Sequence, residues 1–138
     1  KKSQDSLNIA RAWEFISDKE GLDTPVTQKG NNFSGGEKQR LSLARALLRD
    51  APVLVLDDAA SALDYVTEAE VMQSVRRTCR DKAVINISQR AGTIRRADKI
   101  LVLDGGRVMG YGTHQQLLEN CELYRMLSGK TETAGGQA

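Results

Sequence analysis

Ser34, Gly35 and Gly36 stand directly before a stretch with helical spacing, and together they could bind an anion. A hydroxyl and two unshielded backbone N–H groups would lie at a helix N-terminus, where orphan donors and the helix dipole both favour negative charge. Glycine also lets the backbone approach a phosphate closely. Ser34 and Glu37 match a capping box, in which the hydroxyl accepts from the Glu37 N–H and the carboxylate reaches back. A capped helix without a ligand is the alternative interpretation.

Polar residues also follow two predicted strands. The apolar run Val53–Leu56 is typical of a strand buried on both faces of a parallel sheet, and Asp57 and Asp58 come directly after it. Ligands bind at this edge of α/β sheets, although two acids in a surface turn are the alternative. A second buried strand, Ala83–Ile87, leads to Gln89. Its amide could hydrogen-bond a phosphate oxygen, but it carries no charge and cannot shuttle a proton.

The elements that would position these residues alternate between helix and strand, which predicts an α/β sandwich. Apolar spacing predicts a helix over Leu7–Ile16, one after Glu37 that ends at Asp50–Pro52, and one from about Val66 to Cys79. Further along we expect a short helix near Ala91–Ala97, a strand over Lys99–Leu103, a hairpin turn at Gly105–Gly106 into Arg107–Tyr111, a helix capped by Thr113 with His114 in its first turn, and a flexible tail after Ser128.

The composition limits the kind of protein. A net charge of +2, from 20 Lys and Arg against 18 acids, gives no sign of a nucleic-acid or membrane-surface partner. No apolar run approaches the roughly 20 residues that cross a bilayer. The start at Lys1 instead of Met suggests a fragment. Cys79 and Cys121 are far apart and lack metal-ligand spacing, so we expect ordinary cytosolic thiols.

The stretch Asn32–Ala46, N-F-S-G-G-E-K-Q-R-L-S-L-A-R-A, resembles the signature motif and helix of ATP-binding-cassette (ABC) nucleotide-binding domains. Val53–Asp58 resembles the Walker B strand, Ser61–Asp64 resembles the D-loop, and residues 8 to 128 together resemble the exporter type. The resemblance implies an α/β fold: a partial P-loop NTPase-type (RecA-like) parallel-sheet core with a remnant of the helical signature subdomain. No Gly-x-x-x-x-Gly-Lys-Ser/Thr occurs, so the Walker A region is absent and the chain alone should bind ATP weakly or not at all.

The resemblance also implies roles for individual residues. In the family, two cassettes sandwich two ATP molecules, and each site takes its signature motif from the opposite cassette. The implied ATP-binding residues are Ser34, Gly35, Gly36, Glu37 and Asp64. Asp57 would hold Mg²⁺ through water, and the loop that contains Asp64 would cross the dimer interface.

Two positions depart from the family pattern. Asp58 stands where the family has Glu, the base or orienter for the attacking water, and Gln89 stands where it has the His that contacts the γ-phosphate. The shorter Asp58 side chain displaces its carboxylate by roughly an ångström, about twice what catalytic geometry tolerates. A casual loop substitution is the alternative for Gln89. Both departures would weaken the site built on this chain's own core while the signature stays intact.

These observations predict half of an asymmetric, heterodimeric exporter at the cytoplasmic face of the cell membrane. It would act as an ABC-type ATPase with ATP and Mg²⁺, beside a second nucleotide-binding domain and transmembrane domains. An ATP-gated dimerisation or regulatory module that never hydrolyses is the alternative. A soluble cassette ATPase of nucleic-acid metabolism is disfavoured by the exporter-like Thr67-Glu68 and by the balanced charge.

Within the chain we predict a signature part over residues 1–50, the C-terminal part of the ATPase core over 51–128 and a flexible tail over 129–138. A sheet that lacks its other strands would bare an edge, which favours dimerisation or strand exchange of the isolated chain.

Overall fold

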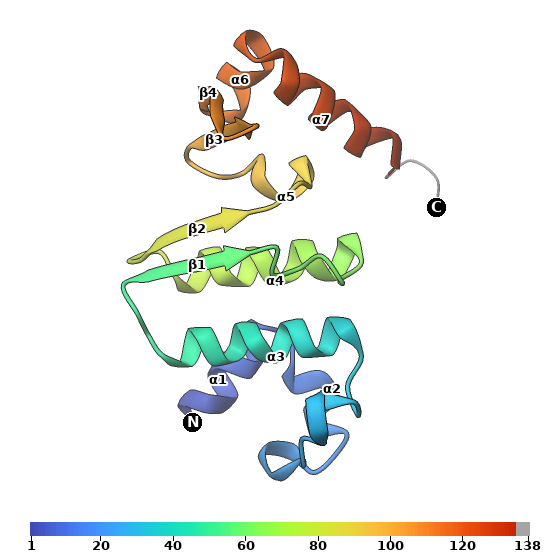
Figure 1. The fold of residues 1–138 in the computed structure, drawn as a ribbon. Helices are drawn as coiled ribbons and strands as arrows, with labels where there is room; N and C mark the ends of the chain where they lie inside the picture. Colours follow the sequence, from blue (N-terminus) through green and yellow to red (C-terminus); the bar gives the residue numbers. More distant parts are fainter. Residues whose placement is uncertain (135–138) are drawn as a thin grey trace. The chain divides into compact units, whose positions relative to one another are not determined.

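The computed structural model describes residues 1–134, in two compact units, Lys1–Ile87 and Ser88–Ala138 (Figure 1). The first unit holds α1 (Lys2–Ile9), α2 (Trp13–Ser17), η1 (Gly21–Asp23), η2 (Gln28–Gly30), α3 (Gly35–Leu48), β1 (Val53–Asp57), α4 (Tyr65–Thr78) and β2 (Ala83–Ile87). The second holds α5 (Ala91–Ile94), β3 (Ile100–Asp104), β4 (Arg107–Gly112), α6 (His114–Asn120) and α7 (Glu122–Ala134). Helices and strands alternate as predicted, so the α/β fold class is confirmed.

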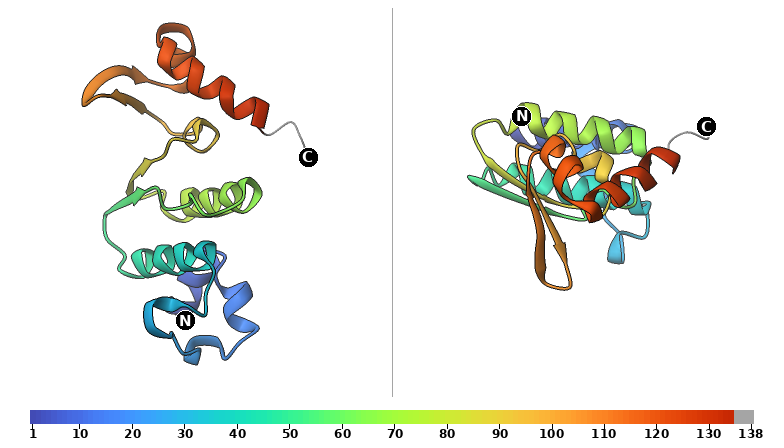
Figure 2. Two further views of the ribbon diagram at one scale, coloured as in Figure 1. Left: turned by 45° about the vertical axis from the view of Figure 1, so that its right-hand side comes forward. Right: turned by 90° about the horizontal axis from the view of Figure 1, so that it is seen from above.

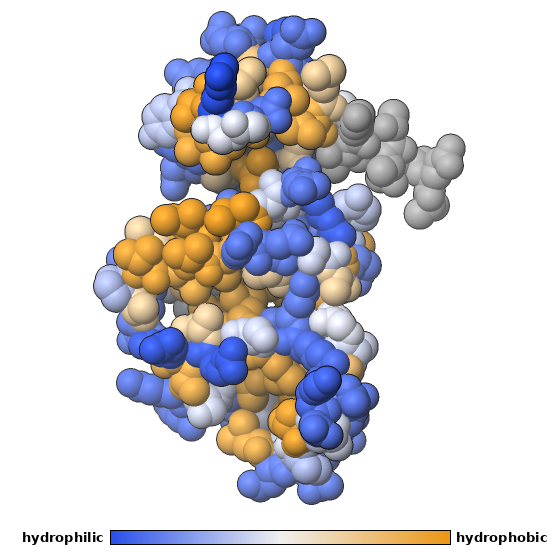
Figure 3. Space-filling model, in the orientation of Figure 1, coloured by the Kyte–Doolittle hydropathy of each residue, from blue (hydrophilic) through white to orange (hydrophobic). Residues whose placement is uncertain are grey.

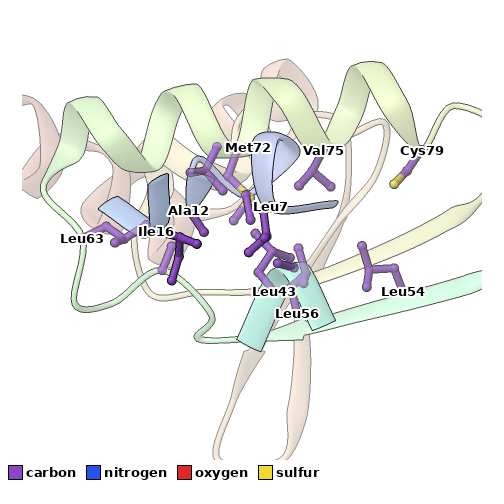
Figure 4. Packing of buried hydrophobic residues seen from close by; sticks show 14 of the residues in the cluster. Leu7, Ala12, Ile16, Leu43, Leu54, Leu56, Leu63, Met72, Val75 and Cys79 are labelled. Atoms are coloured by element: carbon purple, nitrogen blue, oxygen red, sulfur yellow. The ribbon is translucent and has the colours of Figure 1, made fainter. Parts of the chain in front are cut away.

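The first unit is built around a parallel β1–α4–β2 crossover. The two strands pair in register from Val53 with Ala83 to Asp57 with Ile87, so both end at the same edge. Helix α4 covers one face, and Met72 and Val75 point toward Leu54 and Leu56 of β1 (Figure 4). Helix α1 packs against both α3 and α4, which joins the signature helix to the same core.

The strands are not buried on both faces, which corrects our prediction for Val53–Leu56 and Ala83–Ile87. Leu54 and Leu56 are buried, but Val55 is 56% exposed, and Ile85 and Ile87 are each 51% exposed. In the part of the chain that the structure describes, this sheet has two strands, and the face that α4 does not cover is apolar and open (Figure 3). The apolar run identified the strands correctly, but burial depends on what covers them.

The helix predicted over Leu7–Ile16 is also two helices. Arg11 has a φ of 52°, and its N–H donates to the Asn8 carbonyl at 3.0 Å. The Ala12 N–H donates to the Leu7 carbonyl at 2.7 Å, which completes a Schellman cap and ends α1. Glycine usually occupies the left-handed position of this cap, so the arginine gave no warning of the break.

In the second unit, β3 and β4 form an antiparallel ribbon (Figure 2) that turns at Gly105 and Gly106, with φ of 51° and 75°. Helix α6 packs on β4, and α7 packs on α5 and α6. The core contains Ile100, Val102, Leu117, Cys121 and Tyr124. As predicted, Thr113 caps α6 and His114 lies in its first turn, where its Nδ1 is 2.8 Å from the Tyr124 hydroxyl.

Helix α7 continues to Ala134, across the first six residues of the tail that we predict to be flexible over 129–138. A helix that is already nucleated gains one hydrogen bond for each residue it adds, so it can extend beyond the last residue of its apolar pattern. Residues 135–138 lie outside the described part of the chain.

Three other expectations concern the domain boundary, the cysteines and membrane spans. The boundary predicted after residue 50 falls inside the first unit, because Leu43 of α3 and Leu56 of β1 share one core. Cys79 and Cys121 are buried and free. None of the helices within residues 1–134 is both long enough and apolar enough to cross a membrane.

Candidate nucleotide-binding site

The N-terminus of α3 has the predicted capping box. The Glu37 N–H donates to the Ser34 hydroxyl at 3.2 Å, and the Ser34 N–H donates to the Glu37 carboxylate at 2.7 Å. The Lys38 N–H donates to the Ser34 carbonyl at 2.9 Å. The Lys38 bond is the first regular bond of the helix, and the two capping-box bonds satisfy two of the four orphan donors that begin any helix.

The other two donors are the amides of Gly35 and Gly36, which donate no hydrogen bond to any residue within 1–134. Ser34 and Gly35 are exposed, and the 14-residue helix directs the positive end of its dipole toward them. This arrangement fits a phosphate group, since two free amides and a hydroxyl converge at one helix end. The Glu37 carboxylate lies at the same helix end and lowers its positive potential.

The two glycines differ in what they contact. A Cβ built on Gly36 would lie 3.1 Å from Leu63 Cδ2 and 3.2 Å from the Ala62 carbonyl oxygen. A Cβ on Gly35 would meet only Ala62 Cβ, at an ordinary 3.6 Å. Gly36 therefore allows the loop Ser61–Asp64 to pack directly on the start of α3, a role that anion binding alone does not require.

The two acids lie at the carboxyl end of β1. Asp57 is its last residue, and its side chain is exposed. Asp58 has a φ of 49°, a strained value for a residue other than glycine, and its N–H donates to the Ile87 carbonyl at 3.0 Å. The backbone of Asp58 is thus pinned to the end of β2 while its side chain remains exposed.

A cluster of three or more His, Cys, Asp or Glu side chains able to hold a metal is absent from the described residues. One or two carboxylates with phosphate oxygens and water suffice for Mg²⁺, so Asp57 fits the role of a single protein contact to that ion. Within the described residues, Asp57 and Asp58 are the carboxylates at this edge of the sheet.

Gln89 belongs to the second unit, two residues beyond β2, with its side chain exposed. The neighbouring Arg90 N–H donates to the Ser88 hydroxyl at 3.0 Å, which shapes the turn. The structure brings Ser34–Glu37, Asp57, Asp58 and Asp64 into one unit, whereas Gln89 lies in the other.

Asp64 is the N-cap of α4. One carboxylate oxygen accepts from the Thr67 N–H at 2.9 Å and the other from the Thr67 hydroxyl at 2.7 Å. These hydrogen bonds hold the pKa of Asp64 below its usual value of 3.8. Both oxygens are used within the chain, so the carboxylate fixes the end of the loop Ser61–Asp64.

Sequence reasoning missed Gln39, whose side chain bonds to the loop after β1. Only its place in the signature stretch, one turn after Gly36, could have drawn attention to it. It also missed the supports of α3: the Arg40 guanidinium donates to the Arg11 carbonyl at 2.9 Å and lies 4.8 Å over the Phe15 ring.

The parallel β–α–β unit, the acids at its carboxyl edge and the open helix N-terminus are those of a partial P-loop NTPase-type fold. The family described as ABC transporter matches residues 2–61. Two relatives are named ATP-dependent lipid A-core flippase. The one from Alcanivorax borkumensis is 47% identical over 119 residues, which cover 86% of this chain and 20% of that protein. The one from Vibrio vulnificus is 48% identical over 123 residues, which cover 88% of this chain and 21% of that protein.

A solved structure of a bacterial Atm1-family ABC exporter with ATP bound is 36% identical, with a TM-score of 0.89, over 95% of this chain and 23% of that one. The chain belongs to the nucleotide-binding domains of ABC transporters of the exporter type. It spans about a fifth of the length of the curated relatives it matches.

Proposed function

We propose that the chain forms part of the ATPase of an ABC exporter, in which it supplies the signature half of an ATP site on a second nucleotide-binding domain. The observation that carries this proposal is the open N-terminus of α3, where Ser34 is exposed and the amides of Gly35 and Gly36 have no hydrogen-bond acceptor among the described residues. An exposed donor set of this kind can serve a phosphate that another subunit presents. The transporter relatives support the same conclusion.

The residues of this chain contribute to two different ATP sites. The Ser34 hydroxyl and the Gly35 and Gly36 amides hold charge on the terminal phosphate of a partner's ATP. At the site on this chain's own core, Asp57 would hold Mg²⁺ through water, and Asp58 would orient the attacking water. ATP with Mg²⁺ supplies the phosphoanhydride and the cation that neutralises its charge.

Turnover at the chain's own site is slow, because Asp58 is one methylene shorter than Glu and Gln89 carries no positive charge. The signature residues are intact, so the partner's site remains competent. This asymmetry implies a heterodimer with transmembrane domains at the cytoplasmic face of a membrane. The names of the flippase relatives make a lipid the first cargo to test.

The test is the steady-state ATPase of the assembled full-length transporter with Asp58→Glu and Gln89→His together. We expect turnover to rise, by about tenfold at the repaired site, because one well-placed acid–base group contributes at least that much. Asp58→Glu alone is the matched control. The asymmetric proposal is wrong if the partner's own Walker B glutamate can be replaced by glutamine without loss of turnover.

A gate that binds ATP and dimerises without hydrolysis is the second candidate, and the changes at Asp58 and Gln89 favour it specifically. The two candidates separate in a single-turnover experiment with the assembled protein. The exporter releases inorganic phosphate after ATP-driven association of the two nucleotide-binding domains, whereas the gate associates and releases none.

A further inference from the structure

The Gln39 side chain lies between the signature helix and the loop after β1, and it bonds to three positions in that loop. Its Nε2 donates to the Ser61 hydroxyl at 2.9 Å and to the Asp58 carbonyl at 3.4 Å. Its Oε1 accepts from the Ala62 N–H at 2.9 Å. One amide thus joins α3 to residues 19 to 23 positions further along the chain.

The chemistry of the side chain matches these partners. A backbone N–H can only donate, so the Ala62 amide requires the Gln39 oxygen, and the remaining NH₂ group must then face Ser61 and Asp58. A carboxylate in this place could accept from Ala62 but could not donate to the Asp58 carbonyl. A hydrophobic side chain of the same length could do neither.

Other contacts also hold this loop in place, at its start, in its middle and at its end. Asp58 enters it with a φ of 49° and an N–H bonded to the Ile87 carbonyl at 3.0 Å. Leu63 is buried and packs where Gly36 has no side chain. Asp64 ends the loop by capping α4. The Gln39 side chain connects this loop by hydrogen bonds to the first turns of α3, where the amides of Gly35 and Gly36 lie.

We propose that Gln39 is a positioning residue: it holds the loop Ser61–Asp64 in register with the amides of Gly35 and Gly36, so that loop and signature meet a partner's nucleotide as one rigid surface. This inference rests on the proposed function for its nucleotide, but the register itself concerns only this chain. Gln39 does not touch the nucleotide and acts through the residues that do.

The first measurement is hydrogen exchange of backbone amides in the full-length transporter, with and without Gln39→Met. Methionine preserves the length and volume of the side chain but removes its donor and its acceptor. We expect exchange at Ala62 to accelerate by about tenfold, since its hydrogen-bond acceptor is lost, while exchange at Val71 and Val75 of α4 stays unchanged. Unchanged exchange at Ala62 would overturn the inference.

The second measurement is the ATP dependence of turnover in the same preparations. Gln39→Met should lower kcat/KM for ATP by about five- to tenfold, because the loop loses the equivalent of about one neutral hydrogen bond to α3. Gln39→Glu keeps the acceptor for Ala62 and can accept from the Ser61 hydroxyl, so its loss should be smaller. Gln73→Met, the same change at an exposed position of α4, is the matched control and should have no effect.

A double-mutant cycle separates positioning from general destabilisation. The loss of kcat/KM in the double variant Gln39→Met with Ser61→Ala should be smaller than the product of the two single losses, because the two side chains share a hydrogen bond. Equal kcat/KM in Gln39→Met and wild type, in a transporter that hydrolyses ATP, would overturn the positioning role. A wild-type transporter that hydrolyses no ATP would instead refute the proposed function, and the exchange at Ala62 alone would then decide the register.

Discussion

Replacing Gly36 and Gly35 by alanine, one at a time, tests whether the signature helix and the loop Ser61–Asp64 form one packed unit. The two glycines are neighbours in the first turn of α3, so alanine brings each a similar gain in helix propensity, up to about 1 kcal/mol. They differ in surroundings, because the new Cβ at Gly36 meets Leu63 Cδ2 at 3.1 Å and the Ala62 oxygen at 3.2 Å.

The magnitude follows from this difference. Inserting a methyl group into a packed site costs about 1–3 kcal/mol when the neighbours cannot move. The Ala62 carbonyl is backbone, and the adjacent N–H is fixed by Gln39, so it yields less than a free side chain would. Gly35→Ala meets one ordinary contact at 3.6 Å and should be neutral or slightly stabilising. Gly36→Ala should therefore be about 1–3 kcal/mol less stable than Gly35→Ala.

The assay is urea unfolding of the nucleotide-binding domain that contains this chain, followed by circular dichroism and tryptophan fluorescence. Comparing two alanine variants cancels effects on nucleotide binding and on helix propensity. Adding Leu63→Ala should shrink the penalty of Gly36→Ala, because it removes one of the two close contacts. Equal stability of Gly35→Ala and Gly36→Ala would refute the packing argument and leave phosphate approach as the only reason for both glycines.

Two further outcomes follow from the charges around α3 and α4. Glu37→Gln should keep the capping box but remove a negative charge beside the free amides, so half-saturating ATP in the assembled transporter should fall about two- to fivefold at low salt; an equal change in 0.5 M salt would argue against this electrostatic cause. Asp64 has a folded pKa below 3.8, so its contribution to stability is complete above pH 3.8 and is lost as pH falls through the lower folded value. Asp64→Asn should therefore show a shallower acid-induced fall in the unfolding midpoint than wild type, and an identical pH profile would contradict the assigned cap.

Local patterns made several features of the site predictable. A capping box spans four residues, and the side chains at Ser34 and Thr113 bond as their sequences predict. The paired turn glycines and the strand ending at Asp57 were also evident from short stretches. Each of these features depends on groups that are close along the chain.

Features that depend on distant groups could not be predicted. One local feature was missed too: the break at Arg11 is held by backbone bonds to neighbouring residues, but an arginine with a left-handed backbone has no signal in the sequence. The exposure of Val55 and Ile85 depends on what covers the sheet. The bonds of Gln39 cross 19 to 23 residues, and no pairing pattern in a single sequence indicates them.

Helix α3 therefore has two functions along its first two turns, and they explain why its residues depart so little from the signature pattern. The amides of Gly35 and Gly36 have no acceptor within residues 1–134, while the loop after β1 packs against Gly36 and bonds to the Gln39 side chain. That loop begins at Asp58, the residue that we propose orients the attacking water at the chain's own site. We therefore expect a movement of α3 toward a partner's phosphate to strain the Gln39 bonds, including the 3.4 Å contact with the Asp58 carbonyl. We therefore expect the Gln39 bonds and the Gly36 packing to couple the two nucleotide sites of the proposed dimer. An asymmetric pair could keep this coupling even if the site that contains Asp58 hydrolyses ATP slowly.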